Sequence, residues 1–208
     1  MDLSNPFAAI APTLDAGVLQ VLAATTAPMT AAEVHRRMDR GSDEGVRRVL
    51  GRLVRQGIVE RESPARYPLY RLNRDHVAAP LIVSLGLLRS SVFDRIKDAI
   101  EAWEVRPRHA SLFGSFARGE ADEESDIDVL VVRPSGLQGA RLQQWVEQVD
   151  RFAQGLRRAT GNTVQVLDPT PATLSTMLSR QDPLLDEWRA DAVHVSGERL
   201  LDLLRSLR

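Results

Sequence analysis

The sequence contains no cysteine and few aromatic residues. None of its 208 residues is cysteine, so disulfide bonds and thiolate metal sites are excluded. Aromatic residues make up 5% of the chain, and Lys97 is the only lysine, so arginine supplies nearly all the positive charge. No stretch reaches the roughly 18 uninterrupted apolar residues of a membrane span, and the chain opens with neither a basic segment nor a long apolar run. We therefore expect a cytoplasmic protein without a signal peptide or a membrane partner.

Hydrophobic residues nevertheless make up 43% of the chain, which is enough for a core, and 208 residues suit one large or two small domains. The formal net charge is −1, but its distribution is uneven. Residues 1–76 carry 11 Arg against 9 Asp and Glu, a net of +2, and the remainder carries 16 Lys and Arg against 19 Asp and Glu, a net of −3. The basic excess lies in the N-terminal part.

A glycine turn separates two apolar runs in the second half of the chain. His109–Phe113 and the β-branched run Ile127–Val132 predict two strands, and Gly114 breaks the first of them. Glycine lets a backbone come close to a bulky anion. Ser115 adds a hydroxyl and an N–H at the start of a predicted helical turn, where anions are favoured. The turn therefore predicts a phosphate-binding site.

Two aspartates open the second of these strands. Asp126 and Asp128 are two positions apart, so both side chains project from the same face while Ile127 turns into the core. Two carboxylates that close repel each other, and a divalent cation relieves the repulsion. Hard oxygen ligands suit Mg²⁺ or Mn²⁺, which hold phosphates through one or two carboxylates. A metal site beside a phosphate site suits nucleotidyl transfer.

Residues 114–132 resemble the signature of the DNA polymerase beta-like nucleotidyltransferase superfamily, and most closely its minimal bacterial and archaeal members. The signature runs Gly-Ser, Ala-Arg-Gly, a short acidic loop, Ser-Asp-Ile-Asp and a hydrophobic strand, and it is present without a gap. The resemblance implies a small mixed sheet flanked by helices, which binds an NTP with Mg²⁺ or Mn²⁺ and passes NMP to a hydroxyl acceptor. Arg118 would neutralise phosphate charge or, equally, pair with the acidic loop. The implied site residues are Asp126 and Asp128 for catalysis and metal binding, and Gly114, Ser115 and Arg118 for the nucleotide.

The chain departs from this family at one position. Family members usually carry a third carboxylate on the strand that begins here at about Thr163, and the matching residue is Gln165. The third carboxylate usually completes a second metal site or serves as the base, and a neutral amide cannot act as a base. Nucleotide binding would then survive while transfer slows or stops. The acids of the loop that could substitute are Asp122, Glu123 and Glu124, whereas Asp168, the nearest acid, lies on the other parity and past the strand end.

The basic N-terminal part shows the pattern of three helices followed by a hairpin. Thr30 and Glu33 form a predicted capping box, and Ser42 is a predicted N-cap. The order resembles the winged helix-turn-helix of bacterial ArsR-like and MarR-like regulators over about residues 12–75. Helices are predicted at residues 14–24, 31–38 and 42–55, and strands at residues 58–62 and 67–72.

The third of these helices has an apolar face and a basic face. The resemblance implies that it enters the major groove of double-stranded DNA and that its arginines meet phosphates or guanine edges. A solvated basic face, or a winged helix that binds only proteins, is the alternative. The implied DNA-binding residues are Arg47, Arg48, Arg52 and Arg55 on the helix and Arg66 on the wing.

Apolar residues recur every three or four positions from Leu81 to Trp103, which predicts one continuous helix. Its apolar stripe suits packing on the catalytic domain and packing on a second copy of the chain equally well, and the second arrangement would make a homodimer. We therefore expect an α+β protein with a winged helix-turn-helix at residues 1–76, a connecting helix at residues 77–106 and a nucleotidyltransferase domain at residues 107–208. The last domain should hold a helix at residues 137–159, a strand at 163–167, helices at 173–179 and 183–190, a strand at 193–195 and a helix at 197–207.

Three functions fit this sequence. The first is a DNA-binding protein whose nucleotidyltransferase domain transfers NMP to a protein, an RNA or a small molecule. The second is a transcriptional regulator whose domain senses nucleotide or oligomerises after losing catalysis. The third follows from the resemblance alone, because minimal nucleotidyltransferases often act as antitoxins that modify or mask a HEPN ribonuclease toxin and repress their own operon.

Overall fold

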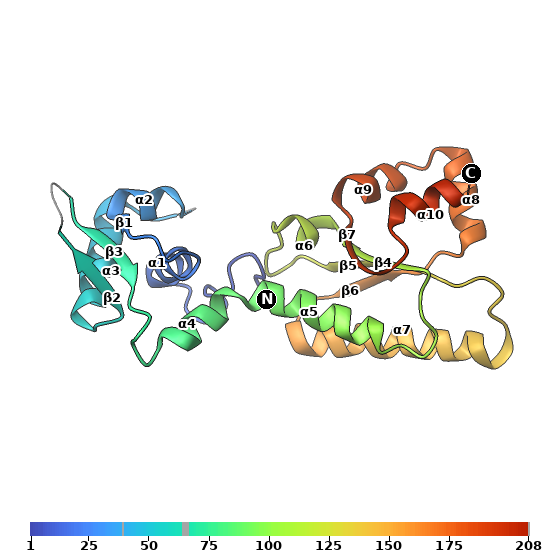
Figure 1. Ribbon diagram of the computed structural model, residues 1–208, viewed down its shortest axis with the longest axis horizontal. Helices are drawn as coiled ribbons and strands as arrows, with labels where there is room; N and C mark the ends of the chain where they lie inside the picture. The colour runs from blue at the N-terminus through green and yellow to red at the C-terminus, as the bar shows by residue number, and fades with distance from the viewer. Residues whose placement is uncertain (39, 64–66, 208) are drawn as a thin grey trace. The chain divides into compact units, whose positions relative to one another are not determined.

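A computed structural model describes residues 1–38, 40–63 and 67–207 (Figure 1). The chain forms two compact units. One consists of Asn5–Arg89 and is called the N-terminal unit; the other consists of Met1–Ser4 and Ser90–Arg208 and is called the C-terminal unit. No helix in the described ranges is long and apolar enough to cross a membrane.

The N-terminal unit consists of helices and a small antiparallel sheet with the strand order β1-β3-β2. Strand β1 is only two residues long and was not expected from the sequence, because one of its residues, Thr30, belongs to the capping box and two residues carry no strand pattern. The turn expected between β2 and β3 falls partly outside the described residues. The elements are α1 (Leu14–Ala23), β1 (Met29–Thr30), α2 (Ala31–Arg36), α3 (Asp43–Arg55), β2 (Val59–Glu62), β3 (Leu69–Leu72) and α4 (Ala79–Gly86).

The helix starts in this unit follow the predicted capping. The Thr30 hydroxyl accepts a hydrogen bond from the Glu33 N–H, and the Glu33 carboxylate accepts one from the Thr30 N–H, so the capping box is confirmed. The Ser42 hydroxyl accepts a hydrogen bond from the Gly45 N–H at the start of α3. These contacts satisfy N–H groups that a helix leaves without intrahelical partners.

The C-terminal unit contains a four-stranded mixed sheet with the order β6-β5-β4-β7. Strand β4 runs antiparallel to β5 and β7, and β5 runs parallel to β6, so the expected mixed sheet is confirmed. Its elements are α5 (Leu88–Glu101), β4 (His109–Phe113), α6 (Gly114–Arg118), β5 (Ile127–Val132), α7 (Gly139–Thr160), β6 (Val164–Leu167), α8 (Pro171–Arg180), α9 (Leu184–Asp191), β7 (Val193–Gly197) and α10 (Leu200–Ser206).

Both faces of this sheet are covered, and β5 shows how its residues alternate between them. Ile127, Val129 and Val131 pack with α5 and α7 on one face. Leu130 and Val132 pack with α8, α9 and α10 on the other (Figure 1). A strand buried on both sides needs the near-continuous β-branched run found in the sequence.

The expected continuous helix over residues 80–103 is wrong. Helix α4 ends at Gly86 and α5 begins at Leu88, and the boundary between the two units falls after Arg89. Ile82 and Val83 pack on the core of the N-terminal unit, while residues of α5 pack on the sheet of the C-terminal unit. Glycine is a poor helix former, so a break costs little there. The expected connecting segment 77–106 is therefore shared between the units.

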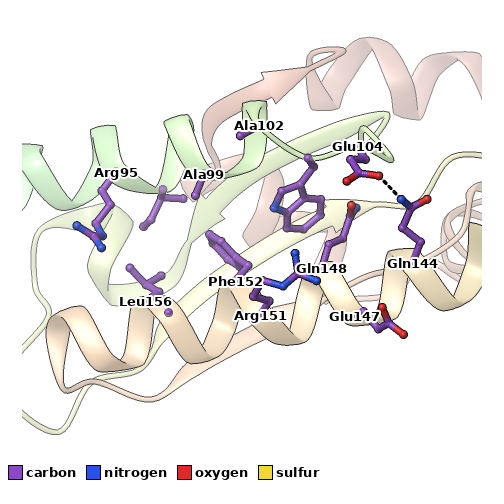
Figure 2. A pocket seen from close by; sticks show the side chains of 13 residues that line it. Arg95, Ala99, Ala102, Glu104, Gln144, Glu147, Gln148, Arg151, Phe152 and Leu156 are labelled. Carbon is purple, nitrogen blue, oxygen red and sulfur yellow. Dashed lines mark hydrogen bonds between the residues drawn. The ribbon is translucent and has the colours of Figure 1, made fainter.

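Helices α5 and α7 border a groove with a cavity of 570 Å³ (Figure 2). The Trp103 ring meets the Phe152 ring edge-on with 5.7 Å between their centroids. At one end, the buried Gln148 side chain donates to the Val105 carbonyl at 2.7 Å and accepts from the Val105 N–H at 3.3 Å. This groove lies on the sheet face opposite to Leu130 and Val132.

Candidate functional site

The two aspartates lie at the start of β5. Asp126 directly precedes the strand, and Asp128 pairs with Phe113 of β4 on one side and with Gln165 of β6 on the other. Burial raises the pKa of the Asp128 carboxyl, the charge of Asp126 raises it further, and the Arg118 guanidinium lowers it. Repulsion between the carboxylates is therefore present in the fold, and a bound cation would relieve it.

Gly114 makes room for one of these carboxylates. Its φ of +70° lies in the left-handed region, which residues with a side chain rarely adopt. A Cβ atom added there would overlap Oδ2 of Asp128. The sequence suggested that this glycine admits an anion, and the structure shows that the group admitted is the protein's own aspartate.

Ser115 and Arg118 lie on the short helix α6, which follows this turn. Ser115 is half-buried, and its carbonyl accepts a hydrogen bond from the Glu120 N–H at 2.9 Å. Gly119 ends the helix in the left-handed conformation with a φ of 79°. The helix is anchored by the buried Phe116 ring. Arg118 therefore lies four positions after Gly114, at the last position of α6.

The Arg118 guanidinium forms two ion pairs. Nε donates to the Glu120 carboxylate at 2.7 Å, and the Asp191 carboxylate at the end of α9 accepts a second bond. These bonds raise the pKa of Arg118. The expected alternative of a salt bridge to the acidic loop is therefore present. Asp191 lies 73 positions away in sequence, so no local pattern could have predicted its contact.

Gln165 contacts the aspartate pair directly. It faces Asp128 in the parallel register of β5 and β6, and its Nε2 donates a hydrogen bond to Oδ2 of Asp126 at 2.6 Å. An amide donor thus occupies the position at which the family resemblance places a third carboxylate. The bond uses one oxygen of Asp126 and offsets part of its negative charge.

Two of the acids near this position have other partners. Asp168 accepts bonds from Arg133 and from the Trp145 indole. Asp122 accepts from the Ser125 hydroxyl at 2.7 Å, which lowers the pKa of its carboxyl. In the part of the chain that the structure describes, no group of three or more His, Cys, Asp or Glu residues could hold a metal ion. Two carboxylates fit one hard cation that also holds a phosphate.

Four of the five arginines proposed for DNA lie on α3, and three of these four form ion pairs. Arg47 bonds to Asp43 at 2.7 Å, Arg48 to Glu44 at 3.1 Å, and Arg52 to Asp15. Arg47 and Arg48 keep 56% and 80% of their side-chain surface exposed, so their pairs are weak and open to competition. Arg55 is also exposed, and Arg66 lies outside the described residues.

One comparison with known protein families matches a segment of the C-terminal unit. Residues 94–162 match the nucleotidyltransferase domain family, about a third of the chain, and this segment includes the glycine turn and both aspartates. No curated protein matches the chain.

Three solved toxin–antitoxin structures are similar to the chain. The first, determined with AMP-PNP, has 20% identity, covers 55% of this chain and 82% of its own, and gives a TM-score of 0.38. A doubly substituted MntA-HpeT complex gives 17% identity, coverages of 55% and 82%, and a TM-score of 0.38. A singly substituted MntA-HpeT complex has 20% identity, covers 55% of this chain and 80% of its own, and gives a TM-score of 0.36. Residues 94–162 of this chain carry a nucleotidyltransferase domain.

Proposed function

We propose that the C-terminal unit binds a nucleoside triphosphate with one Mg²⁺ or Mn²⁺ ion and transfers its nucleotidyl group to a hydroxyl acceptor. The observation that carries the proposal is the pair Asp126 and Asp128 beside the Gly114 turn, within the segment that matches the nucleotidyltransferase domain. A cation held by the pair would neutralise phosphate charge at the reacting centre. Ser115 would supply a hydroxyl and an N–H to the phosphates.

The reaction breaks a phosphoanhydride bond and forms a phosphate ester bond. The acceptor oxygen attacks the α-phosphorus, the bond from that phosphorus to the oxygen that bridges to the β-phosphate breaks, pyrophosphate leaves, and the proton of the acceptor hydroxyl passes to solvent. Asp126 and Asp128 would hold the cation through their carboxylates, and the cation would hold the triphosphate. Arg118, near enough to Asp128 to lower the pKa of that carboxyl, adds positive charge at the same place.

Transfer from α-labelled NTPs tests this proposal, with a cell lysate as the source of acceptors. We expect label that requires Mg²⁺ or Mn²⁺ and that is lost in Asp126→Asn/Asp128→Asn. The matched control is Asp182→Asn/Asp186→Asn, which removes the same charge around the start of α9. Label that persists in Asp126→Asn/Asp128→Asn would show that these aspartates do not hold the metal for transfer.

The bond from Gln165 to Asp126 favours a second candidate function. With an amide at this position, the domain would bind nucleotide, or a protein partner, without transferring NMP. The chain would then act as a transcriptional regulator that senses nucleotide, or as an antitoxin that masks a toxin. The observation behind this candidate is the 2.6 Å donation from the amide to a carboxylate that a second metal would need.

Gln165→Glu separates the two candidates. If the amide blocks transfer, the added carboxylate should raise label transfer and increase the number of bound Mn²⁺ ions from one to two, counted by electron paramagnetic resonance. Gln165→Ala is the control, since it frees Asp126 without adding a ligand. Equal transfer by the wild type and Gln165→Glu would show that the wild type needs no third carboxylate.

We further propose that the N-terminal unit is a winged helix-turn-helix that binds double-stranded DNA through α3. Its helices and antiparallel sheet support this proposal, together with the exposed arginines Arg47, Arg48 and Arg55. The ion pairs of Arg47 and Arg48 lie on the surface, so phosphates can displace them at little cost. Phosphate contacts of this kind would make binding steeply dependent on salt.

Gel shifts on genomic DNA fragments at several salt concentrations test this assignment. Arg48→Gln/Arg55→Gln should weaken binding and lower the slope of log affinity against log salt by about 2, roughly 1 for each lost contact. Arg157→Gln/Arg158→Gln on α7 is the control for an equal loss of charge. No complex at low salt would contradict DNA binding, and an equal effect of both variants would contradict the role of α3.

A further inference from the structure

A second cavity lies on the sheet face covered by α9 and α10. It has a volume of 390 Å³ and is lined by residues of α9, strand β7 and α10. At the sheet it reaches His109, the first residue of β4, whereas Asp128 pairs with Phe113 at the far end of the same strand. His109 and Phe113 are four positions apart on β4, which corresponds to about 13 Å at the usual rise of a strand. The cavity is thus distinct from the aspartate pair.

A buried donor without a partner lines this cavity. Trp188 is 1% exposed, and its indole Nε1–H has no hydrogen-bond partner among the described residues. Buried tryptophan N–H groups usually find an acceptor, and one left unpaired costs about 1–3 kcal/mol. The other two tryptophans of the chain are also buried, and the Trp145 indole donates to Asp168. An acceptor bound in the cavity would supply the missing partner of Trp188.

Positive charge surrounds the same cavity. Its lining contains three arginines and His194 against one carboxylate, Asp202. Arg205 pairs with Asp202 at 3.3 Å, and Arg189 pairs with Asp186 at 2.6 Å. Arg199 is exposed and has no ion pair within the ranges that the structure describes. Burial lowers the pKa of His194, and the positive charges of Arg199 and Lys97 lower it further.

The cavity also has a neutral polar wall. Both ring nitrogens of His109 are engaged, Nδ1 with the Glu198 carbonyl at 2.7 Å and Nε2 with the Ser111 hydroxyl at 2.9 Å. Burial lowers the pKa of His109 to about 4, so the ring is uncharged at neutral pH. The arginines therefore provide the charge, and the indole provides a fixed donor.

We propose that this cavity binds a phosphate group, whose oxygens accept hydrogen bonds from Arg199 and from the Trp188 indole. A phosphate carries a charge of about −1.5 to −2 at neutral pH and offers several strong acceptors, so it matches three guanidinium groups better than a singly charged carboxylate does. Inorganic phosphate and the phosphate of a phosphorylated molecule share this chemistry. The proposal is independent of the metal site and goes beyond nucleotidyl transfer.

The indole N–H signals of the ¹⁵N-labelled full chain provide the test. Each of the three tryptophans gives one signal, and Trp188→Phe identifies the one from Trp188. Inorganic phosphate, added at constant ionic strength, should shift this signal saturably and leave the signals of Trp103 and Trp145 unmoved. Nucleoside monophosphate and acetate, titrated in parallel, show whether a phosphate ester is preferred and whether a carboxylate suffices.

Two variants decide the assignment. Arg199→Gln should weaken phosphate binding about tenfold, equivalent to about 1.4 kcal/mol. Arg158→Gln, an equal charge change on an exposed part of α7, should leave it unchanged, as should Asp126→Asn/Asp128→Asn. The proposal is overturned if the Trp188 signal does not respond, if acetate shifts it equally, or if Arg199→Gln and Arg158→Gln behave alike. Loss of binding in Asp126→Asn/Asp128→Asn would instead place the phosphate at the metal site.

Discussion

At the scale of single residues, the aspartate pair is shaped by its neighbours as much as by its own spacing. Asp128 requires a glycine at position 114, and Asp126 accepts a hydrogen bond from Gln165. The sequence shows the pair and the glycine because they are close along the chain. It identifies Gln165 only through the family resemblance, and it gives no sign of its bond to Asp126, because that contact spans 39 positions.

Gly114→Ala should disturb the site in two ways. The left-handed backbone would cost about 1–3 kcal/mol of stability, and the added methyl group would displace the Asp128 carboxylate. We expect Mn²⁺ affinity to fall about tenfold or more, measured by titration with electron paramagnetic resonance.

Gly136→Ala is the matched control for this substitution. Gly136 has a similar φ of +75°, but an added Cβ would meet nothing within 4 Å. The two variants should therefore share the backbone cost and differ in metal affinity. Equal Mn²⁺ affinities would show that the Gly114 contact does not hold Asp128 in place.

His109 should make the fold sensitive to acid. Its pKa is lowered by burial from 6.5 to about 4, so between these values the unfolded chain binds a proton that the folded chain does not. The stability due to neutral His109 is complete above about pH 6.5 and declines as the pH falls toward 4, by up to about 3 kcal/mol. Urea unfolding should show a shallower decline from pH 7 to 5 in His109→Gln than in the wild type. Parallel declines would contradict the lowered pKa.

At the scale of secondary structure, the elements that follow a strict local pattern were predicted from the sequence. A short apolar run predicted β4, a β-branched run predicted β5, and a capping box predicted the start of α2. The prediction of one continuous helix from Leu81 to Trp103 failed because the two parts of its apolar repeat pack in the cores of different units. The repeat continues without interruption across the break between α4 and α5, and Gly86 was the local sign of that break.

A buried glutamine of α7, Gln148, forms hydrogen bonds with the segment that follows α5. Gln148 forms hydrogen bonds with both backbone groups of Val105, which is 2% exposed. Gln148→Ala would leave these groups unpaired and should lower the free energy of unfolding by about 2–4 kcal/mol in denaturant titrations. Gln143→Ala, on the exposed side of the same helix, should change it by less than about 0.5 kcal/mol. Equal effects would exclude a special role for the Gln148 contacts.

At the scale of the whole molecule, the chain passes between the two units twice. Met1–Ser4 belongs to the C-terminal unit, where Leu3 is 1% exposed within the core and the Ser4 N–H donates to the Ala121 carbonyl at 3.1 Å. No sign of this arrangement is present in the sequence, because four residues carry no periodic pattern. The boundary expected at residue 76 was placed at the end of the hairpin, whereas the N-terminal unit, as defined by contacts, extends to Arg89.

Leu3→Ala should destabilise the C-terminal unit although Leu3 precedes the N-terminal unit in sequence. Truncating a buried leucine costs about 2–5 kcal/mol. Hydrogen exchange should show faster opening of amides in β4 and β5, with those in α3 unchanged. Ile10→Ala is the control, because Ile10 is 71% exposed. Faster exchange of amides in α3 instead would contradict the position of Leu3 in the core of the C-terminal unit.

The position of Met1–Ser4 also bears on the order of events during synthesis. The segment leaves the ribosome before Asn5–Arg89, yet the core that receives Leu3 includes residues as late as Leu156 and Val195. The N-terminal unit is continuous and can complete its own core while later residues are still being added. The C-terminal unit cannot complete its core until β7 has been added, and it takes up Met1–Ser4 only then, after the N-terminal unit has been able to fold.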